Sequence, residues 1–97
     1  MGRYLVLWEA DDAKIPLDPK VRRESWLAAC EITRQDLESG LTKDWGYFLG
    51  QPKGFSIHEG TEEEIGKALL KYMPYFRFQV FPIRTLDQLV EAIRTIE

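Results

Sequence analysis

The hydrophobic positions along the chain follow two different spacings. Short segments in which apolar and polar residues alternate predict four β-strands, at residues 4–10, 43–49, 55–59 and 76–81. Longer segments carry apolar residues three and four positions apart, which predicts helices at residues 19–39, between Thr61 and Pro74, and at residues 86–96. The expected order of elements is therefore β-α-β-β-α-β-α.

Capping residues mark where each helix begins. Asp18 can accept hydrogen bonds from free backbone N–H groups, and Pro19 already has the φ of a first helical turn. Gly40 suits the left-handed residue that ends the first helix. Each of the other two helices begins with a capping box, a Thr followed three positions later by Glu or Gln: Thr61 with Glu64, and Thr85 with Gln88.

The economical fold for this order is α+β, a ferredoxin-like βαββαβ sandwich with an added C-terminal helix. Its antiparallel sheet would have the strand order 4-1-3-2 with helices on one face, and residues 1–97 would form a single ferredoxin-like domain. The other face would stay uncovered, which indicates a partner surface or a ligand cavity. The aromatic side chains that we expect on this open face are Tyr4, Trp8, Trp45, Tyr47 and Phe81.

Charge and composition narrow the classes of partner. The chain has 13 Lys and Arg against 16 Asp and Glu, a net charge of −3, so it has no basic excess for binding nucleic acid. Cys30 is the only cysteine, which allows no intrachain disulfide and fits a reducing compartment. The apolar runs are too short for a signal peptide or a membrane span. We therefore expect a cytoplasmic protein with no nucleic-acid or membrane partner.

Three segments carry a resemblance to a known superfamily: SGLTKDWGYFLG, GFSIHEGTEEEIGKALLKYMPYF and FRFQVFPI. Their shared pattern is a Gly-and-Trp strand, a short strand with a polar end, a capped helix, a Pro-aromatic break and an edge strand. The chain thus resembles the dimeric α+β barrel superfamily, in particular small muconolactone isomerase-like proteins. The resemblance implies a homodimer whose open sheet faces close into a barrel, with a small-molecule cavity in each subunit. It carries over no catalytic residue by position.

Titratable side chains near the expected open face could move protons. His58 has an ordinary pKa near neutrality and would lie beside Ser56, either as a proton shuttle or as a hydrogen-bonded residue of the dimer contact. Glu59 and Glu9 end neighbouring strands. They could share a proton and act as acid or base, or they could be solvated strand ends that pair with an arginine such as Arg77.

Arg77 and the aromatic residues are candidates for ligand binding. On the open face, Arg77 would either clamp a carboxylate with two parallel hydrogen bonds or form an ion pair. Other side chains would either line an apolar cavity or fill the dimer core: Tyr4, Trp8, Trp45 and Tyr47, with Ser56 beside them.

The sequence has no cluster of His and Cys and no nucleotide-binding motif, so we expect no metal site and no cofactor. Three hypotheses remain. The first is a homodimer with a cavity for a small apolar carboxylate or lactone. The second is an isomerase-type enzyme, in which Arg77 orients the anion and His58 or Glu59 moves the proton. The third is a small haem-linked monooxygenase of the same superfamily.

Overall fold

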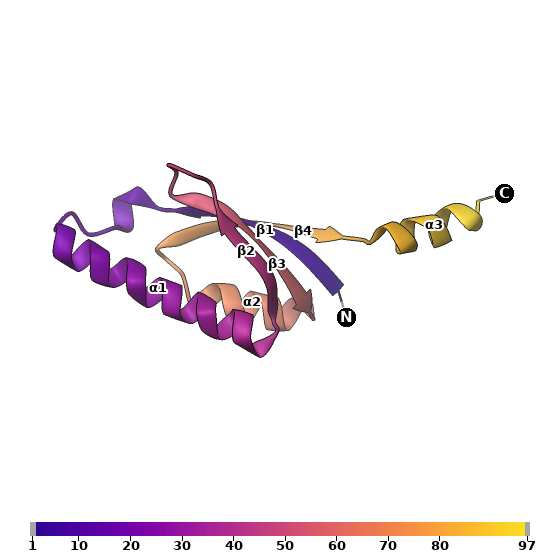
Figure 1. Cartoon of the computed structure of the whole chain (residues 1–97), viewed down its shortest axis with the longest axis horizontal. Coiled ribbons are helices and arrows are strands. Elements are labelled where there is room, and N and C mark those ends of the chain that lie inside the picture. The colour runs from indigo at the N-terminus through magenta and orange to yellow at the C-terminus, as the bar shows by residue number, and fades with distance from the viewer. Residues whose placement is uncertain (1, 97) are drawn as a thin grey trace.

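A four-stranded antiparallel sheet organises the fold in the computed structural model, which describes residues 2–96. The elements in chain order are β1 (Gly2–Ala10), the short 3-10 helix η1 (Asp12–Lys14), α1 (Pro19–Ser39), β2 (Thr42–Tyr47), β3 (Lys53–Gly60), α2 (Glu62–Leu70), β4 (Phe76–Ile83) and α3 (Leu86–Arg94). The strand order is β2-β3-β1-β4, and each neighbouring pair is antiparallel. Helices α1 and α2 lie on the same face of the sheet (Figure 1). The predicted element order and strand order are confirmed.

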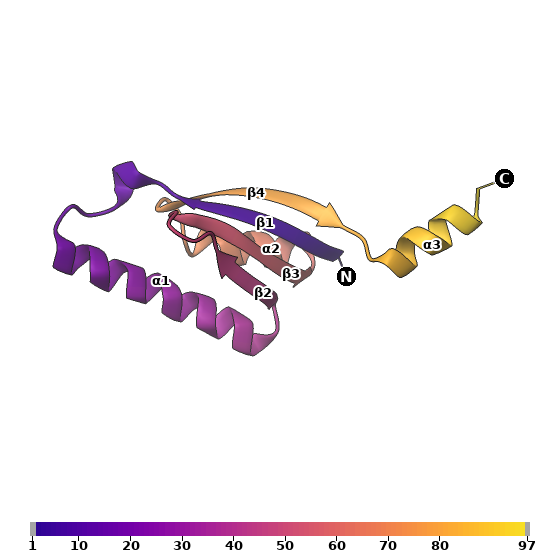
Figure 2. The same ribbon diagram turned by 45° about the horizontal axis from the view of Figure 1, so that its top comes forward.

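Helix α3 lies apart from the other elements. It follows the end of β4 and extends away from the sheet (Figure 2), and the described residues span 61 × 25 × 19 Å. Three of its large apolar side chains are exposed, Leu86, Leu89 and Ile93, as is Ile96 just after it. The whole is a small α+β fold that is compatible with the predicted ferredoxin-like sandwich.

The capping residues act as the sequence predicts. Asp18 accepts hydrogen bonds from the backbone N–H groups of Lys20 and Val21, at 2.9 and 3.2 Å. Gly40 ends α1 with a φ of 85°, in the left-handed region that favours glycine. Both capping boxes form as well, at the starts of α2 and α3. Helix α2 is shorter than expected, because residues 71–75 form turns before β4.

The strand registers overturn one part of the prediction. Val6 lies opposite Ser56 of β3 and Val80 of β4, and its buried side chain packs on Ile65 and Leu69 of α2. The side chains on the same face as Val6 therefore point toward the helices: Tyr4, Trp8, Trp45, Tyr47, Ser56 and His58. Their expected place on the open face is wrong. The residues of β4 expected on the open face do lie there: Arg77 and Phe81.

The physical reason is that both sides of β1 are apolar. Leu5 and Leu7 occupy one side, and Trp8 belongs to the other, so alternation separates the two sets without indicating which one the helices cover. In the structure, α1 presents small side chains such as Ala29 and Thr33 toward the sheet. This leaves room for large aromatic side chains between the helix and the strands.

The two helices cover the sheet differently. Helix α2 packs closely, and its Ile65, Ala68 and Leu69 are buried. On α1, Asp36 is the only buried residue, and its carboxylate lies 2.6 Å from Nζ of Lys71, just after α2. Helix α1 therefore stands off the sheet over much of its length, and the space beneath it is the candidate site.

Gly54 is a point of close approach between the strands and the side chains above them. A Cβ atom at this position would meet the carbonyl oxygen of Gly46, and would lie 2.7 Å from Cζ2 of Trp8 and 2.7 Å from Cα of Tyr47. Gly66 of α2 differs, because a Cβ atom there would meet nothing within 4 Å.

We expect Gly54→Ala to lower the free energy of unfolding by about 3 kcal/mol, because two of the obstructing atoms belong to the backbone and cannot move aside cheaply. The matched control is Gly66→Ala, which should raise the free energy of unfolding by up to about 1 kcal/mol, since Ala favours a helix more than Gly does. Urea unfolding measures both. Equal unfolding midpoints for the two variants would contradict the close approach at Gly54.

Candidate functional site

A cavity of about 420 Å³ lies between α1 and the covered face of the sheet. Its volume falls within the range of about 300–1,000 Å³ that small-molecule sites occupy. Every strand and both packed helices contribute to its wall, which is made of Trp8, Trp26, Ala29, Cys30, Thr33, Thr42, Trp45, Tyr47, Gln51, Pro52, Ser56, His58, Leu69, Tyr72, Phe76 and Phe78. The cavity thus brings together five of the predicted site residues, Trp8, Trp45, Tyr47, Ser56 and His58.

Stacked indoles form one wall of the cavity. The rings of Trp8 and Trp45 lie 5.3 Å apart between centroids and only 11° from parallel. The missing side chain of Gly54 lets the Trp8 ring lie across β3, where its Nε1–H donates to the carbonyl oxygen of Phe55 at 3.3 Å. The indole is therefore fixed both by a hydrogen bond and by contact with the backbone, which presents its flat surface in one orientation.

Phe76 joins this wall to the other elements around the cavity. Its ring makes edge-to-face contacts with Trp8, with Trp26 of α1 and with Tyr72, at centroid distances of 5.8 to 5.9 Å. Such pairs contribute about 0.5–1.5 kcal/mol each beyond the apolar area that they bury. One phenylalanine thus links the sheet, α1 and the turn after α2.

The opposite end of the cavity is polar and closed. His58 is 4% exposed, and its Nε2 lies 2.8 Å from the Ser56 hydroxyl while its Nδ1 lies 3.3 Å from the Thr42 hydroxyl. Both hydroxyl residues are buried too, at 4% and 3% exposure. A β-bulge places Thr42 here, because β2 pairs Thr42 with His58 but Asp44 with Ile57. The sequence reasoning missed Thr42, since a period-two pattern carries no signal for such a bulge.

Burial holds the pKa of His58 below its ordinary value of 6.5. The Asp36 carboxylate opposes this shift, and the Lys71 ammonium adds to it. The imidazole is therefore neutral at pH 7, so one ring nitrogen is a hydrogen-bond donor and the other an acceptor. Each nitrogen faces a hydroxyl group, which can donate or accept.

Polar contacts also hold α1 over the cavity. The hydroxyl groups of Thr33 and Tyr72 lie 2.9 Å apart, close to the ion pair between Asp36 and Lys71. Burial raises the pKa of Tyr72, so its phenol stays protonated at neutral pH. These four residues were not predicted from the sequence. The weak signal that could have found two of them is the pair of polar positions, Thr33 and Asp36, on the inner side of α1.

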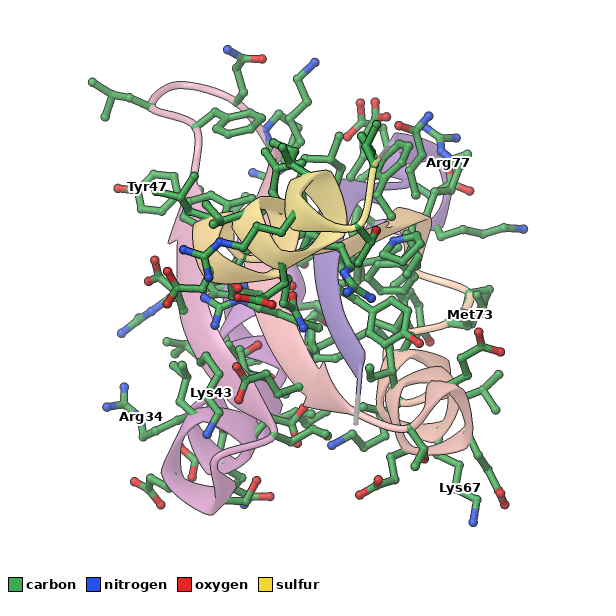
Figure 3. The ribbon with its side chains drawn as sticks, turned by 90° about the vertical axis from the view of Figure 1, so that its right-hand side faces the viewer. Arg34, Lys43, Tyr47, Lys67, Met73 and Arg77 are labelled. Carbon is green, nitrogen blue, oxygen red and sulfur yellow. The ribbon has the colours of Figure 1, made fainter. Side chains whose placement is uncertain are left out.

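Arg77 and Glu59 lie outside the cavity, on the open face. The Arg77 guanidinium lies 3.4 Å from the Glu9 carboxylate and 3.9 Å from that of Asp11, and Glu59 pairs with Arg3 at 2.8 Å. Arg77 comes from one edge strand and the cavity residue Tyr47 from the other (Figure 3). These are the ion pairs that the sequence reasoning held as the alternative to a catalytic or anion-binding role.

The suggested carboxylate pair of Glu9 and Glu59 does not form. β1 and β3 are antiparallel, so their C-terminal ends lie at opposite ends of the strand pair, with Glu59 opposite Arg3 and Glu9 opposite Lys53. Tyr4, which was also predicted to line the cavity, instead packs beside the core around Val6.

Comparison with models of known protein families found no match, and comparison with curated proteins found none either. The resemblance to muconolactone isomerase-like proteins therefore rests on the three quoted segments alone. Between residues 2 and 96, no group of three or more His, Cys, Asp or Glu side chains is arranged to hold a metal ion. None of the helices in this range has the length and hydrophobicity needed to cross a membrane.

The low pKa of His58 makes the stability of the fold depend on pH. As the pH falls below about 6.5, the unfolded chain binds a proton at this residue before the folded chain does. We expect the free energy of unfolding to fall from there toward pH 5, by at most about 1.4 kcal/mol per pH unit for one proton. Urea unfolding at several pH values measures this slope. The control is His58→Asn, whose free energy of unfolding should fall less steeply over the same pH range. If the free energy of unfolding depended on pH equally in the two proteins, the lowered pKa would be contradicted.

Proposed function

We propose that this chain binds a small, largely apolar molecule in the cavity between α1 and the sheet. The observation that carries the proposal is the combination of a space of about 420 Å³, a wall that contains the stacked rings of Trp8 and Trp45, and a buried polar end. A bound apolar molecule would make dispersion contacts with the apolar side chains around this space. A few polar groups at one end of an apolar pocket are typical of sites that orient their ligand.

The exposure of the wall indicates the direction of entry. Tyr47 is 61% exposed, and Gln51 and Pro52 beside it are exposed as well. Ser56 and His58 are almost fully buried. A ligand would therefore pass the turn between β2 and β3, lie along the two indoles and reach the hydroxyl and imidazole groups last.

A second candidate function is proton transfer on the bound molecule. It is favoured by the 2.8 Å contact between the Ser56 hydroxyl and Nε2 of a neutral His58. Arg77 and Glu59, the partners expected from the sequence, are on the other face of the sheet, so this version depends on His58 and Ser56. A haem iron bound at Nε2 of His58 would have to displace the Ser56 hydroxyl, which lies 2.8 Å from this nitrogen.

We also propose that two copies associate through the open face. Its centre is apolar, with Leu5, Leu7, Phe55 and Ile57, and Phe81 beside them is 45% exposed. Ion pairs lie at both ends of this surface. An apolar centre with a charged rim is the usual anatomy of an interface, and a two-fold axis would place the same patch on both subunits.

Ligand binding is tested by isothermal titration calorimetry, in which two-ring aromatic compounds that differ in charge and polarity are titrated into the chain and the dissociation constant of each is measured. We expect Trp45→Ala to weaken the binding of any compound that binds by roughly tenfold, because it removes one of the two stacked rings. Tyr75→Ala, which removes a 51% exposed ring outside the cavity, is the control and should leave affinity unchanged. Equal losses in both variants would argue against binding in this cavity.

Association is tested by light scattering on the purified chain, for which we expect a mass of two chains. Ile57→Glu places a charge at the centre of the open face and should produce monomers. Leu70→Glu makes the same kind of change at a 64% exposed residue of α2 and should leave the dimer intact. A wild-type chain that is monomeric at all concentrations would contradict the dimer.

A further inference from the structure

We infer that the ligand of the cavity is an uncharged, flat ring compound with a carbonyl or hydroxyl group at the end that reaches the buried Ser56. This inference rests on the proposed binding function and adds the chemical class of the ligand. It differs from the carboxylate that the sequence suggested, because the arginine expected to bind that group lies on the open face.

The residues that line the cavity indicate that its ligand carries no charge. Among residues 2–96, no Lys, Arg, Asp or Glu side chain lines the cavity. The nearby charges of Asp36 and Lys71 already pair with each other at 2.6 Å. A carboxylate or an ammonium group that entered the buried end would lose its water without gaining an opposite charge, which is strongly unfavourable.

The flat shape follows from the two indoles. Trp8 and Trp45 are almost parallel and stack on each other, with ring centroids 5.3 Å apart, so the pair offers the cavity an outer ring face and the edges of the rings. Their position depends on Gly54, since any Cβ atom there would collide with the Trp8 ring. Aromatic rings bind other ring systems best in offset stacks or edge to face, and a planar ligand can make either contact with this pair.

The polar group follows from the hydrogen bonds around His58. If Nδ1 carries the proton, it donates to Thr42, and Ser56 donates to Nε2; the Ser56 oxygen is then free to accept a hydrogen bond from a ligand hydroxyl. If Nε2 carries the proton, it donates to Ser56 and Thr42 donates to Nδ1. The Ser56 hydroxyl is then free to donate to a ligand carbonyl. Both arrangements leave each ring nitrogen paired, so either ligand group can be accommodated.

The test uses three compounds with the same ring system: 2-naphthol, naphthalene and 2-naphthoate, each titrated into the full chain at pH 7 by isothermal calorimetry. We expect 2-naphthol to bind most tightly. Naphthalene should bind about 3- to 10-fold more weakly because it lacks one hydrogen bond. 2-Naphthoate should bind at least about 100-fold more weakly, because its carboxylate has to be desolvated without a partner.

A variant identifies the group that recognises the polar end. Ser56→Ala should reduce the affinity for 2-naphthol to that for naphthalene and leave naphthalene itself unaffected. Ser25→Ala, at an exposed position of α1, is the matched control and should change neither. The comparison of the three compounds on the wild-type chain stands even if Ser56→Ala does not fold.

The possible failures are distinct. If 2-naphthoate binds as tightly as 2-naphthol or more tightly, the uncharged ligand class is overturned while binding in the cavity stands. If naphthalene and 2-naphthol bind equally, the polar contact with Ser56 is overturned. If none of the three compounds binds, the proposed function falls together with the inference.

Discussion

The distance between α1 and the sheet is the constraint on which the site depends. Asp36 is the only buried residue of α1, and its carboxylate meets the Lys71 ammonium at 2.6 Å. Beside it, Thr33 bonds Tyr72. These contacts fasten the C-terminal half of the helix to the turn after α2, while small side chains on α1 keep it from closing onto the strands. The cavity exists because the helix is held by polar contacts at one end and is not packed down along its length.

The parts of the fold that depend on local chemistry could be predicted from the sequence. Asp18 and Gly40 bound α1 through their own side chain and backbone, whatever lies around them. The two capping boxes work in the same way. The residues that share one side of each strand were also predicted correctly, because period-two alternation is a property of each strand alone. The choice of covered face was not predictable, since it depends on how helices of limited size meet two apolar sides of β1, with Leu5 and Leu7 on one and Trp8 on the other.

In the candidate site, too, the features that depend on a single strand or on the strand order could be predicted, and those that depend on tertiary packing could not. His58 and Ser56 are neighbours on one side of a single strand, so their association could be foreseen, and the aromatic residues of adjacent strands followed from the strand order. Arg77 was assigned to the same surface because its strand alternates too, but the register pairs it with Glu9, on the opposite face. The position of Thr42 depends on a β-bulge, and the burial of Asp36 depends on a partner 35 positions away. Neither can be recognised from the local pattern of apolar and polar residues.

The close contact at Gly54 has an evolutionary consequence. Two of the three atoms that a Cβ would meet there, the carbonyl oxygen of Gly46 and Cα of Tyr47, belong to the backbone of the neighbouring strand. A smaller residue at position 8 would therefore not make room for a side chain at position 54. In divergent copies of this chain, glycine should persist at position 54 even where position 8 is no longer Trp. The glycine then reports the spacing of β2 and β3, whereas position 8 reports whether the aromatic wall of the cavity is kept.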